Sequence, residues 1–268
     1  MDIFMEVAML QEDRFLKILD YLKQKPIVTF AELSQVTGAS VGTIRRDLSN
    51  LEKNGMLNVV RGGATARKDD ITKQAFDIRG LEHKNEKKEL VQLLENIVID
   101  GQAIALNSGT TNVETANFLV ENYKRLTIVT NNLRIVDILR KAENFTVIVL
   151  GGVFDREEYA IGGKQTEKEI LSYNFDLSIL AVNAISEKKG ITEFRPKEVN
   201  IIKAFLQSSK TNVVVADYSK FDRISYINVC GIEQLDYIIS DSNVTKEQIE
   251  RYTKRGVKIC TPKIGDYN

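Results

Sequence analysis

Apolar residues recur with a helical spacing at the start of the chain. Residues 12–23 carry Leu16, Leu19 and Leu22 on a helical period, which predicts a short amphipathic helix. Pro26 follows and ends this helix, because proline removes a backbone donor and clashes with the preceding turn. The first segment therefore predicts one helix with a buried side.

Two more helices are predicted directly after it. Thr29 and Glu32 have the Thr-x-x-Glu spacing of a capping box, which predicts a helix from there to Val36. Gly38 suits the positive φ that often ends a helix, and Ser40 is a favourable N-cap for the next one. This order predicts two helices joined by a short turn.

The third helix is predicted to run to about residue 54 and to close at Gly55. Its apolar positions occur at intervals of three, four and three and form one stripe, namely Val41, Ile44, Leu48 and Leu51. The same geometry turns a polar face outward, made of Thr43, Arg46 and Asn50 with Arg45 on the flank. Two extended segments follow, at 56–60 and 64–67, and their short connection predicts a two-stranded wing.

Strands and helices alternate in the rest of the chain. Seven apolar runs predict strands, at residues 103–106, 126–130, 146–150, 177–182, 212–216, 237–240 and 256–260. Helical patterns precede or separate several of them, at residues 85–96, 111–121, 133–141, 166–172, 196–208 and 246–255. Continuous apolar strands that alternate with helices predict an α/β fold with a Rossmann-like, doubly wound sheet.

The domain boundaries follow from these patterns. Residues 68–80 are polar and mixed, without a clear period, and we interpret them as a linker. We expect a winged helix-turn-helix domain over 9–67, a linker over 68–80 and an α/β domain over 81–268.

Composition narrows the class of protein. A hydrophobic fraction of 43% and a charged fraction of 28% are those of an ordinary globular protein. The net charge is zero, so any basic surface for nucleic acid must be local. Residues 40–67 hold five basic and two acidic side chains, whereas residues 1–39 hold four basic and six acidic ones. Positive charge is therefore concentrated on the predicted third helix and wing.

Several classes of site are disfavoured. Cys230 and Cys260 are too few for a disulfide framework and lack metal-site spacing, and His83 is the only histidine. We expect no metal and no cofactor. No apolar run approaches the ~18–20 residues of a membrane span, and the acidic start is a poor signal peptide. These features predict a protein of the reducing cytoplasm.

The second and third helices form a helix-turn-helix pattern whose tip points to DNA. The hydroxyls of Ser40 and Thr43 suit phosphate oxygens, and Arg45 and Arg46 suit the acceptors of guanine. Arg61 in the wing adds a fifth candidate contact to double-stranded operator DNA. The alternative is a three-helix unit for protein docking, with the arginines on a solvated face; the tip, the charge and the wing together favour DNA.

This region resembles the N-terminal signature of the DeoR family of bacterial regulators. The residues that carry the resemblance are 43–48, Leu51, Glu52, Gly55 and 61–64. The resemblance implies that Asp47 braces the arginines rather than touching DNA. It also implies a start shortly before the first helix, which fits Met9 and makes residues 1–8 an extension.

Three small-residue loops follow predicted strands in the second half. Ser108, Gly109, Thr110 and Thr111 open a helix, where hydroxyls and backbone N–H groups suit an anion such as phosphate. Asn131, in the loop of residues 130–132, and Gly152, in that of residues 151–152, follow the next two strands. The carboxyl ends of parallel strands share one edge, so the loops predict a site there, although each turn alone needs such residues for its geometry.

A fourth candidate segment lies further on. Asp217 and Lys220 follow another strand and suit sugar hydroxyls and phosphate, or alternatively form an exposed ion pair or helix cap. The loops at 108–112, 130–132, 151–152 and 217–221 are similar to the sensor domain of the DeoR family. The resemblance implies a fold like that of phosphosugar isomerases and a phosphorylated sugar effector. Ser108 to Thr111 would bind the phosphate, and Asn131, Asp217 and Lys220 would line the rest of the pocket.

The sequence departs from the family at two places. Asn107 stands where the family often has Asp, and residues 181–184 lack the usual glycine-rich turn. A sugar-phosphate isomerase carrying a helix-turn-helix is the alternative function, but Asn183 cannot take a proton, and Glu193 and Glu198 are expected on a solvated face. We therefore expect no catalytic residues, and a sugar-metabolism repressor that acts as a homodimer or homotetramer. A module that binds no DNA is the third class.

Overall fold

The computed structural model describes residues 10–53, 57–66 and 76–262. Contacts divide the chain into two compact units, Met1–Glu82 and His83–Asn268, and each is described by itself. The expected start at Met9, the end of the third helix at Gly55 and most of the expected linker lie outside the described residues.

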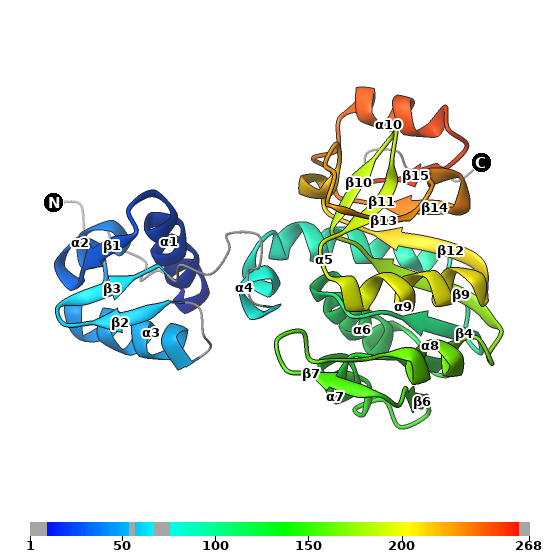
Figure 1. The fold of residues 1–268 in the computed structure, drawn as a ribbon, viewed down its shortest axis with the longest axis horizontal. Coiled ribbons are helices and arrows are strands. Elements are labelled where there is room, and N and C mark those ends of the chain that lie inside the picture. Colours follow the sequence, from blue (N-terminus) through cyan, green and yellow to red (C-terminus); the bar gives the residue numbers. More distant parts are fainter. Residues whose placement is uncertain (1–9, 54–56, 67–75, 263–268) are drawn as a thin grey trace, which may run out of the picture. The chain divides into compact units, whose positions relative to one another are not determined.

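The first unit is a winged helix-turn-helix (Figure 1). Its first three helices are α1 (Gln11–Gln24), α2 (Phe30–Thr37) and α3 (Val41–Lys53). The capping box of Thr29 and Glu32 is formed, and Gly38 has a φ of 71°, as the sequence predicts. Three antiparallel strands follow the order β1-β3-β2, with bounds Ile27–Thr29 (β1), Asn58–Val60 (β2) and Gly63–Thr65 (β3).

The core of this unit corrects two expectations. Ile44, Leu48 and Leu51 are fully buried, but Val41, the first residue of α3, is 39% exposed, so the buried stripe begins at Ile44. Residues 68–80 show no helical period, yet Phe76–Leu81 forms a further helix, α4. Ile78 of α4 packs in the core that α1 contributes to, so tertiary contact supplies what the local pattern lacks.

The second unit is built on seven strands in the order β15-β14-β12-β9-β4-β5-β6, and all six pairings are parallel. Their bounds are Ala103–Leu106 (β4), Thr127–Thr130 (β5), Thr146–Val149 (β6), Phe175–Ala181 (β9), Ser209–Val215 (β12), Tyr237–Ile239 (β14) and Lys258–Cys260 (β15). These are the seven strands that the apolar runs predict. The prediction of a doubly wound α/β sheet is confirmed.

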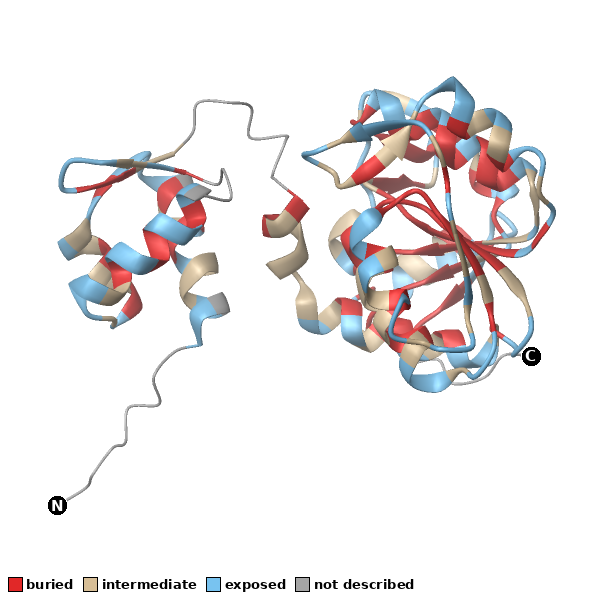
Figure 2. Cartoon of the chain, turned by 90° about the horizontal axis from the view of Figure 1, so that it is seen from below, coloured by how far each residue is buried: buried red, intermediate tan, exposed pale blue. Residues whose placement is uncertain are grey.

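Helices cover both faces of this sheet (Figure 2). They are α5 (Lys84–Gln92), α6 (Thr110–Asn122), α7 (Leu133–Leu139), α8 (Lys164–Ile170), α9 (Pro196–Gln207) and α10 (Lys246–Thr253). Within β12, Val214 packs in the core shared with α8, α9 and α10, while Val213 and Val215 pack in the core shared with α5, α6 and α7. Alternate side chains of a strand point to opposite faces, so both faces need apolar residues.

Two small sheets were not predicted. A hairpin joins β7 (Val153–Asp155) to β8 (Ala160–Gly162), and a three-stranded antiparallel sheet contains β10 (Ala184–Ser186), β11 (Gly190–Glu193) and β13 (Ile227–Cys230). Their residues did not stand out as continuous apolar runs of the kind that predict the strands of the main sheet. Among the described residues, no helix is long and apolar enough to cross a membrane.

Candidate functional site

The predicted recognition helix α3 begins at a formed N-cap. The Ser40 hydroxyl accepts a hydrogen bond from the Thr43 backbone N–H at 3.2 Å, and the two hydroxyls lie 2.9 Å apart. Ser40 is exposed and Thr43 is half-buried. The tip of α3 therefore presents two ordered hydroxyls at a helix N-terminus, an arrangement that suits a phosphate oxygen.

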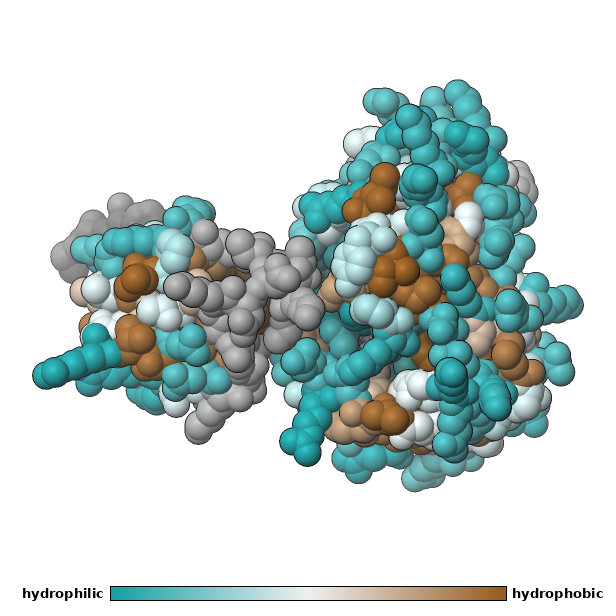
Figure 3. Space-filling model, in the orientation of Figure 1, coloured by the Kyte–Doolittle hydropathy of each residue, from teal (hydrophilic) through white to brown (hydrophobic). Residues whose placement is uncertain are grey.

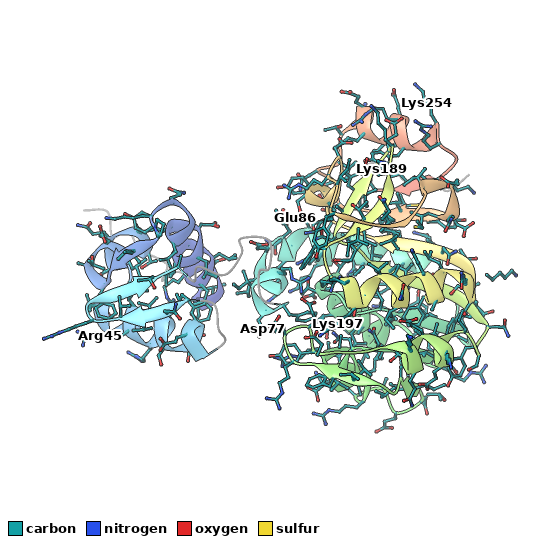
Figure 4. All side chains as sticks on the ribbon, in the orientation of Figure 1. Arg45, Asp77, Glu86, Lys189, Lys197 and Lys254 are labelled. Atoms are coloured by element: carbon teal, nitrogen blue, oxygen red, sulfur yellow. The ribbon has the colours of Figure 1, made fainter. Side chains whose placement is uncertain are left out.

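Three arginines extend this surface. Arg45 and Arg46 on α3 and Arg61 in the β2–β3 turn are all exposed. The Arg45 guanidinium lies over the Phe30 ring, 5.1 Å from its centroid, and the side chain lies at the surface of the unit (Figure 4). Arg46 Nε donates to the Gly42 carbonyl at 3.4 Å. Neither of these two contacts involves a carboxylate: Arg45 lies over a ring, and Arg46 donates to a backbone carbonyl.

Asp47 has a different role from the one the resemblance implies. Its carboxylate is buried and accepts hydrogen bonds from Arg14 at 2.7 and 3.2 Å and from Gln11 at 3.2 Å. Arg14 and Gln11 belong to α1. Asp47 therefore ties the recognition helix to α1 and does not brace Arg45 or Arg46 in the structure.

In the second unit, the loop after β4 packs closely on β9. A Cβ at Gly109 would lie 2.3 Å from the Cβ of Ala181, so only glycine fits. Asn107 Oδ1 accepts from the Ala181 N–H at 2.8 Å, and its Nδ2 donates to the Ala181 carbonyl at 3.0 Å. The amide of Asn107 both donates and accepts, which a carboxylate cannot do. This departure from the family therefore fixes the loop against β9.

The hairpin β7–β8 meets the same loop. Ser108 Oγ donates to the Glu158 carbonyl at 3.2 Å, and Asn132 Nδ2 donates to that carbonyl at 3.0 Å and to Ser108 Oγ at 2.8 Å. Ser108 is fully buried, and Thr110 and Thr111 are nearly so. The expected anion-binding loop is therefore bonded to the protein's own carbonyl group in this structure.

Asn131 and Gly152 also lie beside this hairpin. Asn131 Nδ2 donates to the Ile161 carbonyl at 3.0 Å and to Glu198 Oε1 at 3.2 Å. At Gly152, with a φ of 150°, a Cβ would lie 2.2 Å from Thr166 Oγ1 and 2.8 Å from the Gly162 carbonyl. Close packing by itself explains why position 152 is a glycine.

Asp217 and Lys220 follow β12, at the same edge of the sheet. The strands β12, β9 and β4 are parallel neighbours, so the loops that follow them lie at one edge. Asp217 is fully buried and accepts from the Ser219 N–H at 3.0 Å, which makes it the N-cap of a short 3₁₀ turn. Lys220 is half-buried. The structure thus brings the sequence-predicted sensor residues to one edge, and no direct contact of Asp217 or Lys220 with Ser108–Thr111 is observed among the described residues.

Sequence reasoning missed a buried charged cluster at this edge. Arg195 donates to Glu193 at 2.8 and 3.0 Å and to Glu158 at 2.8 Å, and all three side chains are largely buried. Glu198 is also buried, so the expectation of a solvated face for Glu193 and Glu198 is wrong. The signal in the sequence is the opposite charge of Glu193 and Arg195, which lie two residues apart and share one face of an extended chain.

Burial and charge act in opposite directions on these carboxyl groups. Burial favours the neutral form of Glu193, but the adjacent Arg195 guanidinium outweighs it and lowers the pKa. Burial raises the pKa of Glu198 to about 7, although the charge of Arg195 opposes the shift. At neutral pH, Glu193 is ionised and Glu198 is partly protonated.

The comparisons with known proteins follow this geometry. Residues 14–70 match the DeoR-like helix-turn-helix domain, and residues 82–242 match the DeoR C terminal sensor domain. The chain belongs to the DeoR family.

Named relatives of this DeoR-family regulator match it along most of their length. It is 30% identical to the uncharacterized HTH-type transcriptional regulator FruR of Bacillus subtilis, over 87% of this chain and 92% of that protein. It is 27% identical to the regulator GolR of Listeria innocua, over 91% and 95%, and 29% identical to the glycerol-3-phosphate regulon repressor of Escherichia coli, over 87% and 92%. The protein is therefore a DNA-binding transcriptional regulator.

A solved structure is also similar to part of the DeoR-family chain. The ribose 5-phosphate isomerase of Methanocaldococcus jannaschii has a TM-score of 0.39 and 14% identity, over 52% of this chain and 55% of that chain.

Other candidate chemistry in this DeoR-family protein is limited. Among the described residues, no group of three or more His, Cys, Asp or Glu side chains is arranged to hold a metal ion. Burial raises the pKa of the Cys230 thiol to about 11, which keeps it protonated and unreactive. A polar surface groove of about 670 Å³ lies beside the β10–β11 turn and includes Lys188, Lys203 and Glu233, away from the sensor loops. The face of the second unit seen in Figure 3 is mainly hydrophilic, with separate apolar patches.

Proposed function

We propose that this DeoR-family regulator represses a sugar-metabolism operon and that a phosphorylated sugar controls its binding to operator DNA. One observation carries the proposal: α3 is a capped helix that presents Ser40, Thr43, Arg45 and Arg46 beside a basic wing, in a helix-turn-helix. The names of its relatives, which include a glycerol-3-phosphate regulon repressor, support a sugar-related regulon.

Each of the five candidate contact residues of the first unit has a proposed role at DNA. Ser40 and Thr43 bind backbone phosphate, which positions α3 in the major groove. Arg45 and Arg46 contact base edges, and Arg61 in the wing contacts the backbone. Residues 9–67 act as the DNA-binding domain, 68–80 as the linker and 81–268 as the sensor. Two such domains in a homodimer, or four in a homotetramer, bind repeated half-sites on the operator in the cytoplasm.

The effector site is proposed at the carboxyl edge of the sheet in the second unit. Ser108, Gly109, Thr110 and Thr111 bind the phosphate, whose oxygens replace the Glu158 carbonyl as the acceptor for Ser108. Asn131, Gly152, Asp217 and Lys220 surround the rest of the ligand. Lys220 supplies positive charge for the phosphate, and the buried Asp217 carboxylate supplies an acceptor for hydroxyls.

The effector is bound without turnover in this proposal. Isomerisation needs a base beside the substrate carbon, and Asn183, which accepts a hydrogen bond from Ser225, cannot take a proton. A specific observation favours the alternative enzyme, because a pKa of about 7 at Glu198 suits a general base. Incubation of the protein with ribose 5-phosphate or glucose 6-phosphate tests this, and product formation that Glu198→Gln abolishes would establish an isomerase.

A gel-shift titration with the protein's own upstream DNA tests the regulator itself. We expect sequence-specific binding that weakens as salt rises, because basic side chains release counterions from DNA. A phosphorylated sugar that binds the protein should shift its thermal midpoint and change operator affinity by the same linkage. Absence of binding at low salt would contradict the DNA role, whereas binding that no sugar phosphate changes would contradict only the effector class.

A further inference from the structure

Among the described residues, several buried oxygen atoms in or beside the sensor loops have no hydrogen-bond donor. Two of them, Asn131 Oδ1 and Glu198 Oε2, belong to side chains that are bonded to each other, and the others are Asn112 Oδ1 and Asp217 Oδ2. Asn131 is fully buried and Glu198 is 4% exposed, so neither atom is satisfied by bulk water. A buried polar atom without a protein partner is rare in a folded protein, so these two atoms mark a place where a ligand can bind.

The two side chains are held together in a fixed orientation. Asn131 Nδ2 donates to Glu198 Oε1 at 3.2 Å and to the Ile161 carbonyl at 3.0 Å. These bonds use the donor side of the amide and one carboxylate oxygen. When Glu198 is ionised, what remains on each residue is an acceptor, so the pair then recognises a group that donates.

Neighbouring side chains do not fill this need. Arg195 directs its hydrogen bonds to Glu193 and Glu158, and Asn132 directs its Nδ2 to Ser108 and the Glu158 carbonyl. The donor that is missing must therefore come from outside this cluster. Anionic groups are excluded as partners, because two acceptor oxygens repel them.

The charge of the cluster favours neutral donors over cationic ones. Arg195 lies close enough to Glu198 to act on it electrostatically, and burial keeps the Glu198 carboxyl partly neutral at pH 7. Both effects disfavour an ammonium group in this place. Hydroxyl groups donate without bringing charge, and a sugar supplies several on adjacent carbons.

We propose that Asn131 and Glu198 form the hydroxyl-binding part of the effector crevice and accept hydrogen bonds from neighbouring O–H groups of a polyol chain. The proposal rests on the function proposed above and deepens it by assigning Glu198, which sequence reasoning placed on a solvated face, as the residue that selects the sugar. The phosphate end of the same ligand lies at Ser108–Thr111.

The hairpin β7–β8 covers this part of the crevice. Asn131 Nδ2 bonds to Ile161 of the hairpin, Glu158 pairs with Arg195, and Asp155 pairs with Lys197 at 2.8 Å. Lys197 lies at the start of α9, one residue before Glu198 (Figure 4). In this proposal the hairpin moves to let a ligand reach the two oxygens. The ligand's hydroxyls then take the place of hydrogen bonds that the hairpin made in the closed arrangement.

Calorimetric titration of the full chain at pH 8 tests the assignment. The probes are ribose 5-phosphate and 2-deoxyribose 5-phosphate, glucose 6-phosphate and glucosamine 6-phosphate, the unphosphorylated sugars and inorganic phosphate. We expect the native protein to bind one sugar phosphate more tightly than its deoxy analogue and more tightly than inorganic phosphate. Glu198→Gln should reduce that preference about tenfold, because its amide N–H₂ faces the sugar hydroxyls, and should leave inorganic phosphate unchanged.

Glu157→Gln is the matched control, since Glu157 is an exposed carboxylate of the same hairpin and should not change the preference. The comparison between a sugar phosphate and its deoxy analogue uses the native protein alone. It therefore tests the proposal even if Glu198→Gln folds poorly. Equal affinity of the native protein for every sugar and its deoxy analogue would overturn it. So would an unchanged preference in Glu198→Gln, or a Glu198-dependent preference for glucosamine 6-phosphate, which would indicate an ammonium site.

The outcomes separate this proposal from the one it rests on. Unphosphorylated sugars that bind in a Glu198-dependent way, with no gain from phosphate, would retain the hydroxyl site and contradict the phosphorylated effector. If sugar phosphates bind and change operator affinity without any dependence on Glu198, the phosphorylated effector is retained and the hydroxyl site is contradicted. If none of the probes binds, both proposals are wrong.

Discussion

At several positions of this protein, packing against neighbouring residues or hydrogen bonds to them explain the residue type. Gly109 allows the loop after β4 to pack against Ala181. The side-chain amide of Asn107 forms two hydrogen bonds with the Ala181 backbone in β9. Asp47 holds Arg14 between two helices. In each case a glycine or a short polar residue has a role in packing or hydrogen bonding. Because residues of the same types also suit ligand binding, the sequence alone does not separate a structural role from a ligand-binding role.

Gly109→Ala should destabilise the second unit. The added Cβ would lie 2.3 Å from the Ala181 Cβ, so the loop or the strand must shift, at a cost of about 1–3 kcal/mol. Gly151→Ala is the control, because its nearest neighbours lie at 3.5 and 3.6 Å in ordinary contact. Urea unfolding curves measure both, and equal stability of the two variants would show that the loop yields easily.

Glu198 should make stability depend on pH. Its pKa is raised to about 7 in the folded protein, so between its usual value of 4.5 and pH 7 the folded state binds more protons than the unfolded state. The free energy of unfolding should therefore fall as pH rises through that window, by about 3 kcal/mol in total for this one group. Urea unfolding of native protein and Glu198→Gln at pH 5 to 8 measures this: the stability of the native protein should fall relative to that of Glu198→Gln as pH rises. Parallel curves would refute it.

At the scale of elements, segments within a clear apolar pattern were predictable and the others were not. The seven strands of the main sheet and the helices between them show up as continuous apolar runs and helical periods. The strand β1, the hairpin β7–β8 and the helix α4 did not stand out by such a pattern, although the predicted strands β14 and β15 are as short as β1. They form because partners that are distant in sequence, such as β3 for β1, supply the hydrogen bonds.

The helix α3 gives a prediction that belongs to this scale. Arg46→Ala should weaken operator binding by about 1–3 kcal/mol and relax specificity at one base pair if Arg46 contacts a guanine. Lys17→Ala removes an exposed positive charge from α1 and serves as the control. Gel shifts with operator and scrambled DNA measure both affinity and specificity. An Arg46→Ala protein that binds both DNAs as the native protein does would remove Arg46 from the interface.

At the scale of the whole molecule, the place where the two units join is tied to the sensor loops. His83, the first residue of the second unit, has a positive φ of 51° and packs edge-on against Tyr218, with ring centroids 5.2 Å apart. Tyr218 follows Asp217, and its N–H donates to Asp241 at 2.7 Å. Helix α5 is bonded to the next loop, through Glu89 and Ser242 at 3.2 Å. Asp217 is next to Tyr218 in the chain and Lys220 is two residues from it, so a ligand bound at either residue would lie close in sequence to the contact with His83.

Tyr218→Ala should separate effector binding from the DNA response. Asp217 and Lys220 remain, so we expect sugar phosphate binding by calorimetry to persist. The coupling between effector and operator, typically about 5–150-fold in affinity, should fall towards none, because the ring contact with His83 is lost. Tyr218→Phe keeps the ring and should keep the coupling. If the effector changes the operator affinity of Tyr218→Ala as much as that of the native protein, the contact between Tyr218 and His83 does not transmit the response.

Patterns along the sequence were enough to predict the architecture of both units and the capped start of α3. Both follow from periods and caps that act within one element, such as the Ser40 cap of α3 and the seven apolar strands. The tertiary structure alone decided that Glu193, Arg195 and Glu198 are buried together and that Asp47 pairs with Arg14. The physical reason is that burial and pairing of charges depend on which elements pack together, and local periodicity carries no information about that packing.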